Sequence, residues 1–400
     1  MSNYFHHLIV SHAPTLTVEA GLRQDAGRLV TLTVKSGTMK AVNYDQAPLL
    51  TIWEVTRSCE LACRHCRASA ENLRSPLELS LQEGKVLIDA VAAMGTPLLV
   101  FTGGDPLQRP DLEDLVRHAR ERGLIVATIP AATPRLTRER IFSLKEAGVH
   151  QLALSLDGAT AKEHDEFRGV EGTFNKVEEA VGWIHEAGVP LQINTVFGSW
   201  NADRFDALAE KVRKWGTTFW EIFFLVPTGR GAELTSCTAW QFEHLFDQIH
   251  RFACETEITV KVTEAQHFRR FQQEHGGAAS RHGRISLSSR PVNAGNGFCF
   301  IDFQGKVMPS GFLPLDCGNI RETPLADIYQ NHPDFRQLRN LNALTGPCST
   351  CSFLETCSGG SRARAWALTG DYTSSEPFCI KSAPSSGKST GDATASRLAF

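Results

Sequence analysis

The 400-residue sequence contains no apolar run of about 18 residues, the length from which a transmembrane helix is inferred. Its first residues, MSNYFHHLIVSHAPTL, also lack the basic segment followed by about 7 or more apolar residues that marks a secretory signal. Neither sign of charge dominates, since 41 basic residues face 44 acidic ones and the net charge is −3. These absences predict a cytoplasmic protein that binds neither membrane nor nucleic acid.

Cysteine, by contrast, is plentiful, with eleven residues in the chain. In a protein without an export signal these thiols are expected to be reduced, so clustered cysteines indicate metal ligands or redox groups more than disulfides. Seven of them form two groups: Cys59, Cys63 and Cys66, and then Cys348, Cys351, Cys357 and Cys379. The other four stand apart: Cys237, Cys254, Cys299 and Cys317.

Between residues 50 and 227 the sequence alternates short β-branched runs with segments of helical periodicity. This alternation predicts an α/β fold, with a parallel sheet and crossover helices. Periodicity alone does not distinguish an open doubly wound sheet from a complete or partial barrel. The six predicted strands are residues 50–56, 97–104, 124–130, 151–158, 191–198 and 219–227.

The first cysteine group, in TRSCELACRHCRA, offers three thiolates directly after the first predicted strand. A [4Fe-4S] cubane with three protein ligands leaves one iron open to a small molecule, whereas a structural zinc ion needs a fourth protein ligand. His65 is the nearest candidate for that fourth ligand, but it lies beside Cys66 in a tight loop, where we expect its ring to point away. Unrelated buried thiols are the remaining interpretation.

The spacing Cys-x3-Cys-x2-Cys in a loop after the first strand of a βα array resembles the radical S-adenosylmethionine (SAM) enzymes. The resemblance implies a partial (β/α)6 barrel of the TIM type, with the [4Fe-4S] cluster at the carboxyl ends of the strands. It also implies that the amino and carboxylate groups of SAM chelate the open iron. One electron from the cluster then cleaves SAM to a 5′-deoxyadenosyl radical, which takes a hydrogen atom from the substrate.

Later strand ends carry residue types suited to binding SAM, which strengthens the resemblance. FTGGDP matches the family's Gly-Gly-acidic motif, whose backbone carbonyls and carboxylate accept hydrogen bonds from an ammonium group. SLDG places two polar side chains on one face of a strand. The arginine of HDEFRG resembles a clamp for the SAM carboxylate, and INTVF carries a polar position that often faces the cofactor. The predicted SAM-binding residues are Gly103, Gly104, Asp105, Ser155, Asp157, Arg168 and Asn194.

The second cysteine group, beginning CSTCSFLETCSGGSRARAWA, resembles the auxiliary-cluster region called the SPASM domain. That domain normally holds two further clusters, and the ligand set of its outer [4Fe-4S] cluster is complete here: Cys348, Cys351, Cys357 and Cys379. Two positions where the inner cluster expects cysteine are Ser310 and Ser361, so we predict a single auxiliary cluster. Zinc is the alternative for four thiolates. Whether Cys299 or Cys317 binds metal is left open.

A single auxiliary cluster after a CRHCRA loop resembles the tetrapyrrole-modifying branch, whose members decarboxylate or remove propionate side chains. Basic residues in LVPTGRG and TEAQHFRR are the candidate partners of substrate carboxylates. They are Arg230, His267, Arg269 and Arg270, although solvent-facing arginines, or a histidine that ligates substrate iron, fit the same pattern. No catalytic side chain is assigned.

Two other functions are compatible with parts of the sequence. A maturase of ribosomally made peptides also carries a SPASM domain, but the 49 residues before the barrel are few for a leader-binding module. A non-catalytic iron-sulfur electron carrier needs only the cysteines and leaves GGDP, SLDG and FRG unexplained. For the enzyme, the resemblance implies a flavodoxin-type or ferredoxin-type electron donor.

These patterns predict five segments. Residues 1–49 form a β-rich extension, and residues 50–235 form the radical SAM partial barrel. Residues 236–296 are a linking region, with a helix at 239–255 and a strand at 257–262. Residues 297–381 form the small SPASM-like iron-sulfur domain, which starts with a hairpin at 298–308. The tail at 382–400 is rich in Ser, Thr, Gly and Ala, and we expect it to be disordered.

Overall fold

The computed structural model describes residues 16–17, 33–34, 37–38, 42–276 and 291–382. The predicted disordered tail lies outside the described residues from position 383 onward. Among the described helices, none combines the length and apolar character needed to cross a membrane.

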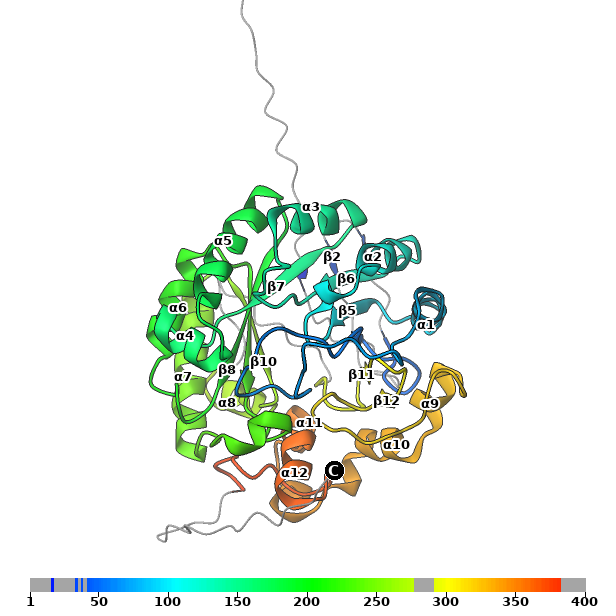
Figure 1. Ribbon diagram of the computed structural model, residues 1–400. Coiled ribbons are helices and arrows are strands. Elements are labelled where there is room, and N and C mark those ends of the chain that lie inside the picture. Colours follow the sequence, from blue (N-terminus) through cyan, green and yellow to red (C-terminus); the bar gives the residue numbers. More distant parts are fainter. Residues whose placement is uncertain (1–15, 18–32, 35–36, 39–41, 277–290, 383–400) are drawn as a thin grey trace, which may run out of the picture.

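A nine-stranded sheet forms the centre of the molecule, in the order β10-β9-β8-β7-β6-β5-β4-β11-β12 (Figure 1). All six predicted strands are present, and each pairs in parallel with its neighbour. They are β4 (Leu50–Glu54), β5 (Leu98–Thr102), β6 (Ile125–Thr128), β7 (Gln151–Ser155), β8 (Leu191–Phe197) and β9 (Phe219–Phe224). The expected α/β partial barrel is therefore confirmed.

The sheet extends beyond the predicted barrel boundary at residue 235. Strand β10 (Thr259–Thr263), which we placed in a linking region, pairs in parallel with β9. At the other edge, β11 (Phe298–Ile301) of the predicted hairpin pairs in parallel with β4, and β12 (Val307–Met308) turns back along it. The segments expected to link or follow the barrel thus contribute strands to its sheet.

Helices cover the outer face of this curved sheet, as Figure 1 shows. They are α1 (Leu81–Ala93), α2 (Leu112–Glu121), α3 (Arg138–Ala147), α4 (Ala161–Arg168), α5 (Thr173–Glu186), α6 (Phe205–Lys214) and α7 (Ala239–Glu255). Capping boxes begin α1, α4 and α7, so several helix starts are encoded locally. A Cβ atom at Gly84 of α1 would lie 2.5 Å from the Trp53 ring, so glycine lets this helix pack closely on β4.

Alternate strand residues divide between two environments, as the pleat of a sheet requires. One set packs under the helices in the main apolar core, for example Trp53, Phe101, Leu152, Ile193 and Trp220. The other set points to the inner face of the sheet, which the outer helices do not cover. Polar side chains at this inner face are therefore placed to meet ligands.

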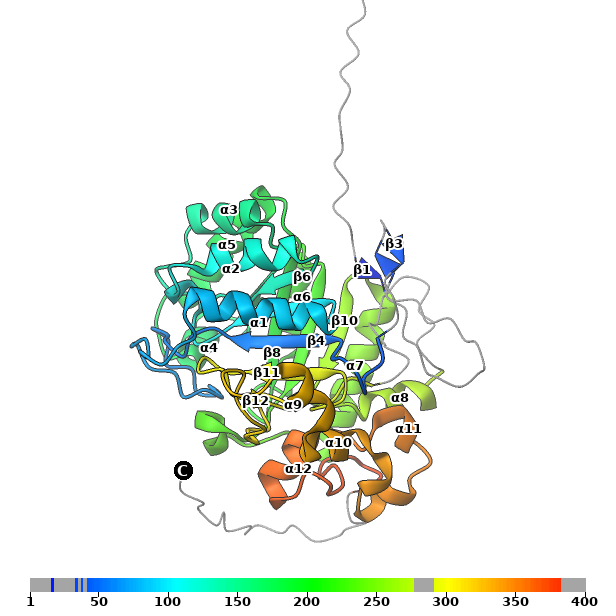
Figure 2. The same ribbon diagram turned by 90° about the vertical axis from the view of Figure 1, so that its right-hand side faces the viewer.

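The remaining elements belong neither to the central sheet nor to its outer layer of helices. Short helices pack together at one side, in the lower part of Figures 1 and 2. They are α8 (Phe268–Glu274), α9 (Leu325–Asn331), α10 (Pro333–Arg339), α11 (Leu354–Cys357) and α12 (Arg362–Thr369). The expected β-rich N-terminal extension contributes an antiparallel sheet of β1 (Leu16–Thr17), β2 (Thr33–Val34) and β3 (Gly37–Thr38).

Candidate functional site

The cysteine loop, residues 57–69, follows β4 at the carboxyl edge of the sheet. Its three thiols gather in one small apolar cluster with Leu61 and Ala70. Backbone N–H groups point at two of the sulfurs: Leu61 donates to Cys59 Sγ and Ala70 to Cys66 Sγ, each at 3.4 Å. Such N–H···S contacts are suited to thiolates, so the loop is built to hold anionic sulfur.

Burial strongly affects the protonation of one of these thiols, Cys59. It raises the pKa of Cys59 to about 12, with smaller contributions from Asp105 and from the two other cysteines of the loop. Without a metal this thiol is therefore neutral at physiological pH. Iron binding has to displace its proton, as is usual for thiolate ligands.

His65 does not act as a fourth ligand in this arrangement. Its ring stacks on Phe167 at a centroid distance of 4.8 Å and an angle of 8°, and Phe167 stacks in turn on Trp200 at 5.0 Å. Burial, with Arg168 next in effect, lowers the pKa of His65 to about 4, so the ring is neutral. The expectation that this histidine points away from the cysteines agrees with the stacking.

The Gly-Gly-Asp segment packs directly against the start of the cysteine loop. A Cβ atom at Gly103 would lie 2.6 Å from the Thr56 carbonyl oxygen, and one at Gly104 would lie 2.5 Å from that of Ser58. Backbone hydrogen bonds join the two segments, from Gly104 N to Thr56 O at 2.8 Å and from Asp105 N to Ser58 O at 2.7 Å. The glycines are thus needed for this close backbone contact, a reason that we did not anticipate from the sequence.

The Asp105 carboxylate is buried and already accepts three hydrogen bonds from the protein. Its Oδ1 accepts from Leu107 N at 3.1 Å and Ala131 N at 3.2 Å, and its Oδ2 accepts from Thr133 Oγ1 at 2.7 Å. Burial raises the pKa of this group. Asp105 therefore holds the loops after β5 and β6 together, and its contact with the ammonium group of SAM stays a prediction.

Asp157 and Arg168 form a buried ion pair beside the cysteine loop. Asp157 also accepts a hydrogen bond from Val196 N at 2.8 Å, and Arg168 Nη1 donates to Cys63 Sγ at 3.6 Å. Burial opposes the charge of both groups, but each raises the charged population of the other, so the pKa of Asp157 falls and that of Arg168 rises. Arg168 Nε has no partner in the structure and remains available to a ligand carboxylate.

Arg230 contacts the cysteine loop rather than the inner face of the sheet. Its Nε donates to Cys63 O at 2.9 Å and its Nη1 to Ala70 O at 3.2 Å. At the preceding Gly229, whose φ is +55°, a Cβ atom would lie 2.5 Å from Cys66 O. Its guanidinium group thus holds the loop backbone, while Nη2 has no partner in the structure, and pairing with substrate stays a prediction.

Four polar residues form a single row across the inner face, which we call the inner row. Strand register aligns Ser155 with Asn194, Asn194 with Glu221, and Glu221 with Lys261. Lys261 Nζ donates to Glu221 Oε1 at 2.6 Å and is 31% exposed. We predicted the first two of these residues but missed Glu221 and Lys261. Their signal was a single charged residue in the apolar segment FWEIFF and the alternation of polar and apolar residues in TVKVT.

The four cysteines of the second group line one cavity, which we call the C-terminal cysteine cavity. Its walls include Cys348, Cys351, Cys357 and Cys379, together with His267 and Arg270. Burial raises the pKa of Cys357 to about 12, and the three other thiols act in the same direction. The ligand set predicted from spacing is thus brought together in space.

Two basic residues of the segment TEAQHFRR, His267 and Arg270, line this cavity. Arg269 Nε donates to Thr356 O at 2.9 Å, next to Cys357. Arg270 is paired with Glu243 and Glu274. His267 is buried, and burial lowers its pKa to about 3. These contacts direct the three side chains at least partly toward the second cysteine group, and their pairing with substrate carboxylates stays a prediction.

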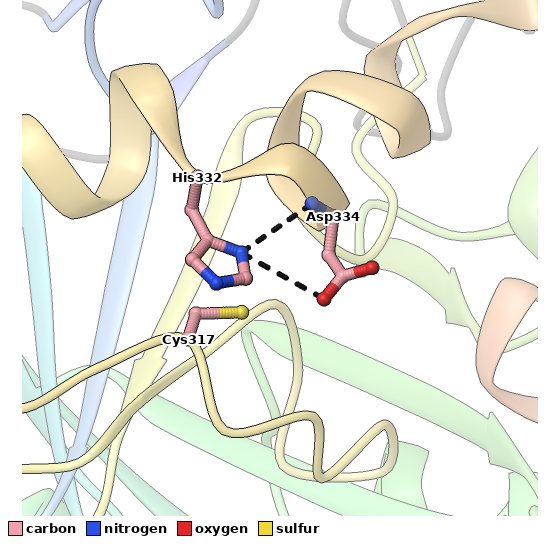
Figure 3. A group of neighbouring side chains, drawn as sticks. All are labelled: Cys317, His332 and Asp334. Carbon is pink, nitrogen blue, oxygen red and sulfur yellow. Dashed lines mark hydrogen bonds and ion pairs between the residues drawn. The ribbon is translucent and has the colours of Figure 1, made fainter.

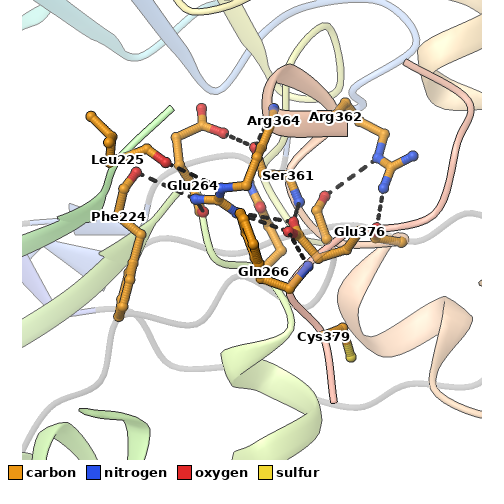
Figure 4. Close-up of polar contacts among 12 residues, drawn as sticks. Phe224, Leu225, Glu264, Gln266, Ser361, Arg362, Arg364, Glu376 and Cys379 are labelled. Atoms are coloured by element: carbon orange, nitrogen blue, oxygen red, sulfur yellow. Dashed lines mark hydrogen bonds and ion pairs between the residues drawn. The ribbon is translucent and has the colours of Figure 1, made fainter. Parts of the chain in front are cut away.

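Ser361 and Ser310 occupy the positions where an inner auxiliary cluster expects cysteine. Ser361 Oγ is hydrogen bonded to the Glu264 carboxylate, and it accepts from Arg364 N at 3.0 Å at the start of α12 (Figure 4). Ser310 Oγ accepts from Phe312 N at 3.1 Å in a turn. Both hydroxyls therefore have defined hydrogen-bonding roles, which agrees with one auxiliary cluster.

Arg364 lies at the centre of the network in Figure 4 and is fully buried. It donates to both carboxylate oxygens of Glu376, at 3.1 and 3.0 Å, and to Leu225 O at 3.1 Å. Further hydrogen bonds reach the carbonyl oxygens of Phe224 and Glu264. One guanidinium group thus joins the ends of β9 and β10 to the region that carries the second cysteine group.

Cys317, His332 and Asp334 form a separate group (Figure 3), with ligand atoms within 4.8 Å of one another. His332 Nδ1 accepts from Asp334 N at 3.3 Å and thereby caps α10, while Tyr372 donates to Asp334 at 2.7 Å. We interpret the group as a helix cap beside a buried thiol. Cys317 and Cys299 both pack in the main apolar core, and neither lines the C-terminal cysteine cavity.

Within the described ranges, that helix-cap group is the one set of three Cys, His, Asp or Glu side chains with such short mutual distances. Sulfurs around a tetrahedral zinc ion lie about 4 Å apart, because each Zn–S bond is about 2.3 Å long. Iron analysis distinguishes the two kinds of site at the cysteine groups, because each [4Fe-4S] cluster contributes about four irons and a zinc site none.

Comparisons with known proteins find a family for the barrel and another for the C-terminal region. The profile of the Radical SAM superfamily matches residues 53–212, and the profile of SPASM, an iron-sulfur cluster-binding domain, matches residues 293–352. Among solved structures, Streptococcus suis SuiB bound to S-adenosylmethionine aligns with a TM-score of 0.66 at 15% identity. That alignment covers 84% of this chain and 78% of SuiB, and it shows the shared fold.

Curated relatives are considerably more similar in sequence. An AdoMet-dependent heme synthase of Nitratidesulfovibrio vulgaris is 38% identical over 337 residues, which cover 82% of this chain and 91% of the relative. A protein of the same name from Methanosarcina barkeri is 38% identical over 342 residues, which cover 84% of this chain and 97% of the relative.

Proposed function

Because the chain belongs to the radical SAM enzymes that carry a SPASM domain, and is homologous to AdoMet-dependent heme synthase, we propose that it oxidises side chains of an iron-containing tetrapyrrole. The observation that carries the proposal is the cysteine loop. There, three thiols converge and the neighbouring histidine is stacked on Phe167, so a bound cubane keeps one iron for SAM.

The residues around the loop fit this cofactor pair. Cys59, Cys63 and Cys66 hold the [4Fe-4S] cluster, which when bound supplies the electron that splits SAM into methionine and a 5′-deoxyadenosyl radical. Arg168, whose Nε has no partner, would pair with the SAM carboxylate, and backbone carbonyls near Gly104 would accept from the SAM ammonium group. The inner row would face the ribose and the substrate.

The proposed substrate chemistry is loss of carboxyl groups from propionate side chains. Removing one hydrogen atom from the carbon next to the ring, then carbon dioxide and one electron, converts –CH2–CH2–COO⁻ into –CH=CH2. The hydrogen atom goes to the deoxyadenosyl radical, and the electron needs an acceptor. An auxiliary [4Fe-4S] cluster on Cys348, Cys351, Cys357 and Cys379, which line one cavity, would serve as that acceptor. A flavodoxin or ferredoxin as donor remains our prediction.

Anaerobic turnover tests the proposal directly. Protein reconstituted with iron and sulfide, reduced with dithionite, is incubated with SAM and iron coproporphyrin III, and the products are separated by mass. We expect 5′-deoxyadenosine, together with porphyrin that has lost one hydrogen atom and one carboxyl group for each propionate that has reacted. If deoxyadenosine forms while every offered tetrapyrrole is unchanged, the substrate class is wrong.

Among the residues that the structure describes in the inner row, Lys261 is the one that carries positive charge. Replacing it tests whether the inner row binds the substrate. In Lys261→Met the carboxylate of the substrate loses a charged hydrogen bond, worth about 1.5–3 kcal/mol or roughly 10- to 100-fold in affinity. We expect the KM for the tetrapyrrole to rise by about that factor while the KM for SAM changes little. The matched control is Lys162→Met, an exposed lysine on the outer helix α4. Equal changes in both KM values would contradict the assignment.

The two alternatives have less support. The likeness to SuiB lies at 15% identity and indicates a shared fold only, so it does not favour a peptide substrate. A non-catalytic electron carrier does not require the contacts that GGDP, FRG and PTGRG make with the cysteine loop. Those contacts serve a site at which one iron must remain accessible to SAM.

A further inference from the structure

His267 is a buried histidine whose polar atoms lack partners. Its side chain is 1% exposed, and neither Nδ1 nor Nε2 has a hydrogen-bond partner in the structure. A buried polar group left without a hydrogen bond costs about 1–3 kcal/mol, and such groups are uncommon in folded proteins. The ring therefore needs a partner other than the described side chains.

The surroundings of His267 leave one side from which that partner can approach. Aromatic rings pack around it, with Phe242 at a centroid distance of 5.1 Å and Phe246 at 5.0 Å. The nearby charged groups already pair with one another, Arg270 with Glu243 and Glu274, and Arg364 with Glu376. The other wall of its surroundings is the C-terminal cysteine cavity, which His267 lines.

We propose that His267 donates an N–H hydrogen bond to a sulfur atom of the auxiliary cluster and thereby raises the reduction potential of that cluster. The inference rests on the proposed function, in that the four cysteines of the cavity hold a [4Fe-4S] cluster. The cysteines already complete the ligand set, so His267 is a positioning and tuning residue and not a ligand.

The physical reason is electrostatic. Reduction adds negative charge that is spread over the cluster sulfurs, and an N–H donor in a dry, aromatic setting stabilises the reduced form more than the oxidised form. A cluster tuned upward in this way is a better acceptor for the electron that leaves the substrate. Electron removal is the step for which the proposed chemistry needs such a group.

The test measures the midpoint potential of the auxiliary cluster by electron paramagnetic resonance. The background protein is a full-length chain with Cys59, Cys63 and Cys66 changed to alanine, so that the auxiliary cluster is the single paramagnet. His267→Phe keeps an aromatic ring of similar size but removes the donor, and His267→Gln retains an N–H group. His244→Phe, at an exposed position of the same helix that carries Phe242, is the control.

We expect His267→Phe to lower the midpoint potential by about 59 mV, a tenfold change in a one-electron equilibrium. The midpoint potential of His267→Gln should lie between those of the parent and the phenylalanine variant, and that of His244→Phe should match the parent. In protein labelled with 15N-histidine, a weak nitrogen coupling to the reduced cluster should be present and disappear in His267→Phe.

Three outcomes separate failure of this inference from failure of the proposed function. If about four irons are bound in the background protein and the potential does not move in His267→Phe, the hydrogen bond is absent and the inference is overturned. A strong coupling typical of direct ligation also overturns it. If no iron is bound and zinc is found instead, the auxiliary cluster itself is lost and the proposed function fails at that point.

Discussion

Changing Cys63 to alanine is expected to reduce the formation of 5′-deoxyadenosine to the level of a control without protein. Cys63 is one of three ligands for the cluster that delivers the electron, and two thiols do not hold a cubane in this loop. The substitution also removes the sulfur to which Arg168 donates, at 3.6 Å. Product is measured by chromatography after anaerobic incubation with SAM and dithionite.

The same variant should retain the auxiliary cluster, so its iron content should fall from about eight to about four per chain. Cys254→Ala is the matched control, because this half-buried thiol lies on the outer helix α7, apart from both cysteine groups. It should keep both the iron content and the turnover of the parent. Turnover in Cys63→Ala at a rate close to that of the parent would mean that the cysteine loop is not the catalytic centre.

Replacing Arg364 with methionine is expected to destabilise the protein by about 3–5 kcal/mol, the cost of leaving a buried charge without its partner. Glu376 would lose the guanidinium group that pairs with both of its oxygens, and three carbonyl oxygens at the ends of β9 and β10 would lose a donor. Denaturant unfolding under anaerobic conditions, followed by circular dichroism, measures the change.

The double variant Arg364→Met/Glu376→Gln should be less destabilised than Arg364→Met alone, because it removes the unpaired charge. Burial opposes the charge of Glu376, and Arg364 is what holds the pKa of that carboxyl below its usual range. In Arg364→Met the carboxyl therefore takes up a proton more readily, and the loss of stability relative to the parent should shrink as the pH is lowered. Arg122→Ala, which breaks an exposed pair with Asp89, should cost at most about 1 kcal/mol. If the loss of stability in the double variant equals the sum of the losses in the two single variants, Arg364 and Glu376 are not coupled and the network is contradicted.

Local sequence signals were sufficient for the barrel and for grouping the cysteines, while their role as metal ligands stays a prediction. The six central strands are continuous apolar runs between recognisable helices, and the cysteine spacings are short enough to be read without a structure. Strands β10 and β11 were placed outside the barrel because other segments separate them in sequence from the six-strand array. Their pairing with β9 and β4 is a long-range contact, which local sequence patterns do not reveal.

The basic residues of TEAQHFRR have contacts that sequence reasoning did not anticipate, for a physical reason. The chain turns at Glu264, whose φ of +57° lies in the left-handed region, and then runs beneath the second cysteine group. Contacts such as Glu264 with Ser361 and Arg269 with Thr356 join residues about ninety positions apart. Charge alone predicted substrate contacts there, whereas burial and pairing direct these side chains toward the cysteine cavity.

The central claim is that the cluster held by Cys59, Cys63 and Cys66 keeps one iron for SAM. Electron-nuclear double resonance on the reduced protein, with SAM labelled by 15N at its amino group and 17O at its carboxylate, tests this claim most directly. We predict strong couplings from both labels, as expected for direct binding to iron, and their absence in Cys63→Ala. A cluster of full iron content that shows neither coupling in the parent protein would contradict the account.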